Sequence, residues 1–182
     1  MPNFCHNTLS IEGKKNDINL LKKEIEKNEN PSIENLYPMP NDLENTISPP
    51  KSAIGMKYSN EHKVNLAKDR KETIPELMPC NNNTKEKQTE LNEKYGYCDW
   101  HAWKTANWGS KWIDEFEFIK ASDGEINCVF DSAWNPPIIL VEKISTKFPN
   151  LNFSLSYNII EEMRDESKLI IIKNGKVQEN KT

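Results

Sequence analysis

The sequence predicts an α+β fold in which helices cover one face of an antiparallel sheet. Short segments that alternate apolar and polar residues indicate half-buried strands. Two pairs of these segments meet at Asp-Gly or Asn-Gly, which are typical of tight hairpins. Segments with apolar residues at helical spacing lie between the strands, and a long polar stretch interrupts the pattern after residue 40.

The N-terminal segment predicts a strand, a helix and a second strand. TLSIE (8–12) alternates, and a helix is expected from Asn16, which can cap it, to about Glu29. SIENLY (32–37) then predicts a short second strand, because the preceding Asn-Pro pair stops the helix. The residues expected to face inward are Leu9, Ile11, Ile18, Leu21 and Ile25.

Residues 41–97 are interpreted as a polar insertion within a single domain that spans residues 1–182. The prolines around its start exclude a central strand. The part at 81–94 is compatible with a solvated helix or with a loop. The insertion is either an arm that reaches a partner or a tolerated surface loop.

Two hairpins are predicted in the second half of the chain. Residues 116–120 and 125–130 alternate on either side of Asp123-Gly124, with Ile126, Cys128 and Phe130 on one face. Near the C-terminus, KLIIIK and GKVQ flank Asn174-Gly175 in the same way.

A helix and a strand are expected between these hairpins. The spacing of Ile138, Val141, Ile144 and Phe148 predicts a helix that Asn135 can cap. LNFSLSY (151–157) predicts a strand. The resulting order is β-α-β, insertion, β-β-α-β and a terminal hairpin, which describes a ferredoxin-like α+β sandwich with one sheet face uncovered.

Four of the five tryptophans lie between Asp99 and Trp112. Because Asp99 and Gly109 interrupt a long helix, a loop or short turns are expected there. The rings could form a contact surface or stack bases together with Lys104 or Lys111. We favour the other interpretation, in which they roof one end of the sheet and are buried. This structural motif comprises Trp100, Trp103, Trp108, Gly109, Trp112 and Trp134.

The overall charge favours a basic partner. The net charge is −4 and the pI is about 5.5, which argues against nonspecific nucleic-acid binding. No apolar run is long enough to span a bilayer. The spacing of the four cysteines fits no disulfide framework and no secretory signal is recognised, so we expect reduced thiols in a cytosol.

No catalytic motif is recognisable, and we expect neither an enzyme nor a cofactor. The histidines are His6, His62 and His101, and Asp99 near His101 is a possible acid–base pair without a nucleophile beside it. A zinc site could combine Cys5, His6, Cys98 and His101, but this spacing is no standard zinc signature, and we expect no metal.

Two acidic clusters are candidate partner-binding sites, since carboxylates pair with arginine bidentately. The first comprises Asp114, Glu115 and Glu117, and the second Glu161, Glu162, Asp165 and Glu166. The alternative is that each is a solvated charged segment. Lys104 and Lys111 are the part of the tryptophan motif that a partner could contact.

Four segments occur in a recognisable order: MPNFCHNTLSIEG, LYPMP, DWHAWKTANWGSKW and FDSAWNPPI. They resemble the YubB-type ferredoxin-like family of small proteins carried by phages and plasmids, over most of the chain outside residues 41–95. The usual opening of that family has Trp where this chain has Phe4. No catalytic residues carry over. The chain is also similar, more weakly, to an anti-CRISPR inhibitor of a type II RNA-guided nuclease.

The resemblance implies a phage or mobile-element protein that antagonises host defence in the bacterial cytoplasm. Its expected partner is a CRISPR effector nuclease with its guide RNA. Such nucleases read a short DNA motif with a pair of arginines and hold nucleic acid in basic channels, which an acidic protein could occupy. The alternative is a single-stranded nucleic-acid-binding module, whose binding would be lost when Trp103 or Trp108 becomes Ala.

Overall fold

The computed structural model describes residues 3–48, 84–159 and 167–178. The chain divides into two compact units. The first comprises residues 1–38 and 104–182, and the second comprises residues 39–103. No helix among the described residues is long and apolar enough to cross a membrane.

The first unit is built on an antiparallel sheet, whose six described strands have the order β2-β3-β1-β4-β5-β6. Strand β1 lies inside the sheet and pairs with β3 and β4, whereas β2 and β6 lie at the edges. Both predicted hairpins and the predicted strand after residue 150 are confirmed. The strands are β1 Phe4–Glu12, β2 Ile113–Ala121, β3 Glu125–Ala133, β4 Asn152–Ile159, β5 Lys168–Lys173 and β6 Lys176–Gln178.

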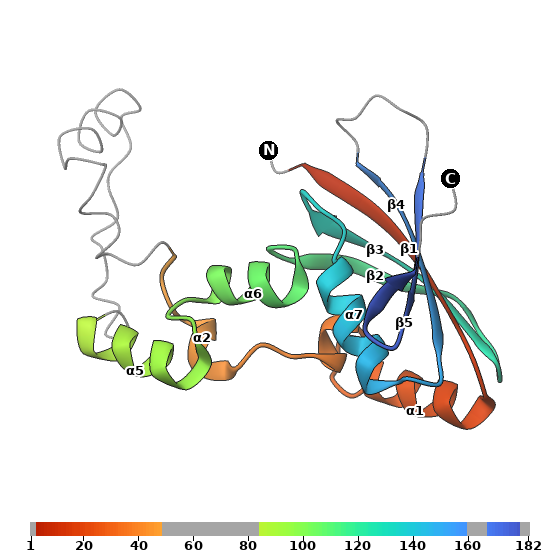
Figure 1. Ribbon diagram of the computed structural model, residues 1–182, viewed down its shortest axis with the longest axis horizontal. Coiled ribbons are helices and arrows are strands. Elements are labelled where there is room, and N and C mark those ends of the chain that lie inside the picture. Colours follow the sequence, from red (N-terminus) through yellow and green to blue (C-terminus); the bar gives the residue numbers. More distant parts are fainter. Residues whose placement is uncertain (1–2, 49–83, 160–166, 179–182) are drawn as a thin grey trace. The chain divides into compact units, whose positions relative to one another are not determined.

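One face of this sheet forms the core. Along β1, buried and more exposed residues alternate, as expected for a strand with one buried face. The helices α1 (Lys15–Ile25) and α7 (Ile138–Lys147) pack on this buried face, where α1 contacts β3, and α7 contacts β4 and β5 (Figure 1). The predicted α+β fold with helices on an antiparallel sheet is therefore confirmed. The core includes Leu9, Ile11, Ile18, Leu21, Ile25, Ile126, Cys128, Phe130, Val141, Ile144, Phe153 and Leu155.

The helix ends differ from the prediction. Helix α1 begins after Lys14, which has no side-chain capping bond, so Asn16 lies inside the helix. It ends at Ile25, whose carbonyl accepts the backbone N–H of Ser32 and the side-chain amide of Asn35. The cap position of α7 is Pro137, so the expected capping by Asn135 was wrong.

The predicted strand at 32–37 was also wrong, because Ile33–Leu36 forms a 3-10 helix, η1. Ile33 and Leu36 are both buried, and their spacing of three suits this helix better than the alternation of a strand. Ser32 caps η1 by accepting the Glu34 N–H at 3.2 Å. The first half of the chain therefore does not form the expected β-α-β unit.

The second unit contains the helices α2 (Asn41–Glu44) and α5 (Lys85–Tyr95). Thr84 caps α5 by accepting the Lys87 N–H at 3.2 Å, and Gly96 ends it at a φ of 76°. Only Leu91 of this helix is buried, so the described part of 81–94 is a solvated helix. Residues 49–83 of the predicted insertion at 41–97 lie outside the described residues.

The tryptophan stretch forms the helix α6 (Trp100–Trp108), so the expected loop was wrong. The Asp99 carboxylate accepts the N–H groups of His101 and Ala102, each at 3.0 Å. Gly109 follows the last residue at a φ of 80°. The two residues that we took as interruptions are therefore the cap and the terminator of one short helix.

Candidate functional site

NWGSKW (107–112) connects α6 to β2, and most of its side chains serve packing. The indole N–H of Trp108, a residue 2% exposed, donates to the Tyr37 carbonyl at 2.9 Å. Lys143 of α7 donates to the Asn107 side chain. The hydroxyl of buried Ser110 lies 3.0 Å from both the Trp112 and the Ala133 carbonyl oxygens, which share its single proton. The motif thus joins α6, α7 and the start of β2.

The tryptophans differ widely in exposure. Trp103 and Trp108 are buried, Trp100 is half-buried, and its backbone N–H donates to Thr46 in the second unit. Trp112 is half-buried and packs edge-to-face on Phe4 with ring centroids 5.4 Å apart. Trp134 is 51% exposed, so it does not complete a buried cluster as expected.

The sheet face opposite the helices presents two informative rows of residues, which follow from the strand register. The first row runs across three strands as Trp112, Ala133 and Phe4, since Ala133 pairs with Phe4 and donates its N–H to the Trp112 carbonyl. The second row, two residues further along each strand, is Asp114, Asp131, His6 and Asn158. An aromatic row therefore lies beside an acidic row on one face.

The acidic cluster predicted at 114–117 lies on the edge strand β2, and its three carboxylates are exposed. A β-bulge separates Asp114 from Glu117, and Glu115 within it has a φ of 53°. None of the three forms an ion pair with another described residue. The cluster therefore presents carboxylates that a cationic partner could bind.

Glu34 is a further carboxylate beside the acidic cluster of β2. The sequence did not indicate it, because its segment was expected to form a strand. Its side chain accepts the Ile113 N–H at 3.2 Å. Burial raises the pKa of Glu34, and the nearby Lys104 opposes this effect. A shallow hollow of about 390 Å³ is lined by Asn30, Pro31, Ser32, Glu34, Ile113, Asp114, Glu115 and Phe116.

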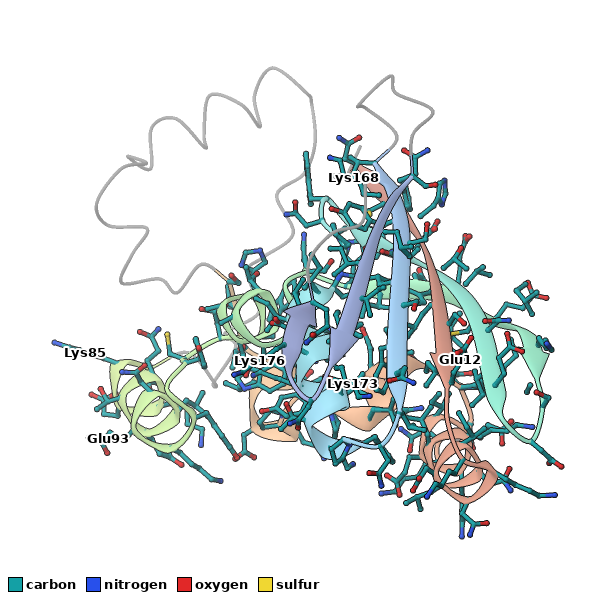
Figure 2. The ribbon with its side chains drawn as sticks, turned by 45° about the vertical axis from the view of Figure 1, so that its right-hand side comes forward. Glu12, Lys85, Glu93, Lys168, Lys173 and Lys176 are labelled. Carbon is teal, nitrogen blue, oxygen red and sulfur yellow. The ribbon has the colours of Figure 1, made fainter. Side chains whose placement is uncertain are left out.

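The two edges of the sheet differ in charge. The β5–β6 hairpin at one edge carries Lys168, Lys173 and Lys176 (Figure 2). Glu12 lies apart from both edges, at the end of the central strand β1. The opposite edge strand, β2, carries Asp114, Glu115 and Glu117. Among the described residues, the β2 edge of the sheet is therefore the more acidic of the two.

Of the other predicted contact residues, the structure describes the two lysines but not the second acidic cluster. Lys104 Nζ lies 4.4 Å from the Trp108 ring centroid, so this lysine covers the buried indole. Lys111 is exposed. The second acidic cluster, Glu161, Glu162, Asp165 and Glu166, lies outside the described residues.

The residues considered for metal binding and catalysis have other surroundings. Cys5 is buried on the helix-covered face, and burial raises its pKa to about 11, whereas His6 lies on the opposite face. The described residues contain no group of three or more His, Cys, Asp or Glu that could hold a metal ion. Asp99 caps a helix, so its proximity to His101 has a structural explanation.

His6 instead pairs with Asp131, with Nδ1 and Oδ1 2.5 Å apart. Their side chains are 59% and 12% exposed, respectively. The two residues are 125 positions apart in sequence, and only the β1–β3 register places them side by side. No sequence spacing could have indicated this pair.

Residues 107–165 match the family model described as a ferredoxin-like domain in Api92-like protein. This part of the chain is ferredoxin-like. The ferredoxin-like α+β prediction is thus confirmed, whereas the YubB-type assignment stays a prediction. The match begins at NWGSKW and spans β2, β3, α7 and β4 of the ferredoxin-like domain.

One solved structure is similar in fold to this chain. The crystal structure of the protein api92 from Yersinia pseudotuberculosis aligns with a TM-score of 0.53 at 10% sequence identity. The alignment covers 100% of this chain and 98% of that one. At this identity the likeness concerns the fold alone. No curated protein matches the chain.

Proposed function

We propose that this protein is a phage or mobile-element inhibitor that binds a basic protein surface through the acidic edge of its sheet. The proposed partner is a guide-loaded type II CRISPR nuclease, whose DNA engagement or cleavage is blocked. The observation that carries the proposal is the group of exposed carboxylates on β2, at Asp114, Glu115 and Glu117.

The local geometry supports binding through side chains. Edge strands often recruit another strand, but the two register irregularities of β2 disfavour continuous pairing along it. The exposed carboxylates are instead available to arginine and lysine side chains. In RNA-guided nucleases, arginines read the short DNA motif and basic channels hold the strands, so an acidic edge is complementary to them.

The proposal is tested with guide-loaded nuclease and a charge-reversal variant, Asp114→Lys/Glu117→Lys. Wild-type protein is expected to co-elute with the nuclease in gel filtration and to inhibit DNA cleavage. The variant should bind at least about tenfold more weakly, because close interfacial charge pairs contribute about 1.5 kcal/mol or more. Binding should also weaken as the salt concentration rises.

A matched control separates the position of the charges from their number. Glu12→Lys/Glu93→Lys changes the net charge equally at two exposed sites, one at the far end of β1 and one on α5 (Figure 2). It should inhibit like the wild type. If wild-type protein does not associate with guide-loaded nuclease, or if both variants lose binding equally, the proposal is wrong.

Binding of single-stranded nucleic acid is the second candidate, favoured by exposed aromatic rings at the start of β1 and just after β3. The predicted stacking on Trp103 and Trp108 does not fit their burial, whereas Phe4 and Trp134 are 36% and 51% exposed. Fluorescence anisotropy with a labelled oligothymidylate measures this activity directly. Salt-sensitive binding that disappears in Trp134→Ala, without nuclease association, would replace the first proposal.

A further inference from the structure

The aromatic row of the open sheet face is a preformed apolar surface. Phe4 and Trp112 flank Ala133 on either side, and their rings meet edge-to-face at 5.4 Å. Ala133 is only 1% exposed, yet Phe4 remains 36% exposed. The pair therefore offers ring surface at the start of β1 that the fold itself leaves unburied.

Trp134 directly follows Ala133 at the end of this row, in a backbone conformation that costs the fold energy. Its backbone φ is 68°, a conformation that costs a large L-residue about 1–2 kcal/mol. Its N–H donates to the Asn3 carbonyl at 2.9 Å, which holds it beside the residue that precedes Phe4. Half of its surface is exposed, so core packing does not account for the strain.

The acidic row lies next to these rings. Asp114 and Asp131 are register partners on the same face, one pleat repeat, about 7 Å, from the aromatic row. Asp131 holds His6 through Oδ1, and Asp114 accepts the Glu115 N–H through Oδ1. Within the described part of the chain, neither carboxylate has a Lys or Arg partner.

We infer that the aromatic row and the adjacent Asp114 together bind an arginine side chain presented by a protein partner. A guanidinium stacks on an aromatic ring and at the same time donates bidentately to a carboxylate, and an arginine side chain can reach across adjacent rows. Lysine lacks the planar fork and stacks less well. A nucleic acid would find its phosphates opposed by Asp114 and Asp131, so charge favours the cationic protein side chain.

This inference deepens the proposed function and rests on it for the identity of the partner. Asp114 and the neighbouring aromatic rings would be the part of the acidic surface that contacts the partner, and arginine the group that they bind. The arginine preference itself can be measured without any nuclease, so the two proposals can fail separately.

The test is an NMR titration of the full-length, ¹⁵N-labelled protein. Two capped pentapeptides, Ac-GRGRG-NH₂ and Ac-GKGKG-NH₂, carry equal charge, and an oligothymidylate serves as the nucleic-acid probe. The arginine peptide should shift the indole N–H signals of Trp112 and Trp134, with about tenfold tighter binding than the lysine peptide, a ratio equivalent to about 1.4 kcal/mol.

Three variants locate the site. Asp114→Asn and Trp134→Gly should each weaken arginine-peptide binding several-fold, and glycine suits the left-handed backbone at 134, which favours folding of that variant. Ile119→Ala, which removes a side chain 61% exposed on the same edge strand, should bind normally.

The outcomes separate the alternatives. Equal shifts with both peptides, no indole shifts, or shifts with the oligothymidylate alone would overturn the inference. Unchanged nuclease binding by Trp134→Gly would also overturn it while leaving the proposed function intact. Arginine-selective binding without nuclease association would support the site and remove only the proposed partner.

Discussion

Replacing Asn7 with leucine tests whether the buried polar network beneath β1 stabilises the fold. Asn7 is 2% exposed and faces the core. Its side-chain amide donates to the Cys5 carbonyl at 2.8 Å, the Ser132 hydroxyl at 2.9 Å and, more weakly, the Phe130 carbonyl at 3.2 Å. Leucine has a similar size but no donor.

The expected loss follows from these contacts. The amide has two N–H groups, so about two hydrogen bonds disappear, each with a net contribution of about 1 kcal/mol. Ser132 still donates to the Asn135 carbonyl at 2.9 Å, so its hydroxyl keeps a partner. We therefore expect the free energy of unfolding to fall by about 2 kcal/mol, or the Tm by about 4–8 °C for a protein of this size.

Urea unfolding at 25 °C, followed by tryptophan fluorescence and circular dichroism, measures this change. Thr8→Leu is the matched control, because the neighbouring Thr8 is exposed on the opposite face of the same strand, and it should alter stability by less than about 0.5 kcal/mol. A double-mutant cycle with Ser132→Ala should show a coupling of about 1 kcal/mol.

The reasoning is refuted if Asn7→Leu is as stable as the wild type or more stable. That result would mean that the apolar gain of leucine outweighs the hydrogen bonds, as happens in some buried polar networks. A loss of stability with no coupling to Ser132 would show that the damage arises from packing.

Three further predictions concern other parts of the fold. Gly109→Ala should lower the free energy of unfolding by about 1–2 kcal/mol, and the Tm with it, because only glycine adopts a φ of 80° without strain. An unchanged Tm would contradict this. Burial raises the folded-state pKa of Glu34 above its ordinary 4.5. The free energy of unfolding therefore falls as the pH rises from the ordinary pKa through the raised one. Glu34→Gln should therefore have the higher Tm at pH 7 and match the wild type below pH 4; a constant difference would refute this. Iodoacetamide at pH 8 should label Cys98 before Cys5 and Cys128, whose pKa values burial raises to about 11 and 12; equal rates by mass spectrometry would contradict this.

Local signals in the sequence were sufficient for most strands. Asp123-Gly124 and Asn174-Gly175 specify tight turns by their backbone preferences, and alternation on either side sets which residues face inward. The same signals misled at Ile33–Leu36, where buried residues three apart belong to a 3-10 helix. At Asp99 and Gly109, capping residues were mistaken for interruptions because the helix between them is short.

The candidate site depended on long-range register. The acidic residues of β2 were visible in the sequence as charges, but nothing local placed Asp131 beside His6 or Phe4 beside Trp112. Exposure was equally hidden, since Trp108 and Trp134 look alike in a sequence, although one is 2% and the other 51% exposed. The sequence by itself determined the strands, their inward faces and the acidic charge, because these follow from neighbouring residues. Only the tertiary structure decided which aromatic and acidic side chains share a face, because strand pairing joins residues more than a hundred positions apart.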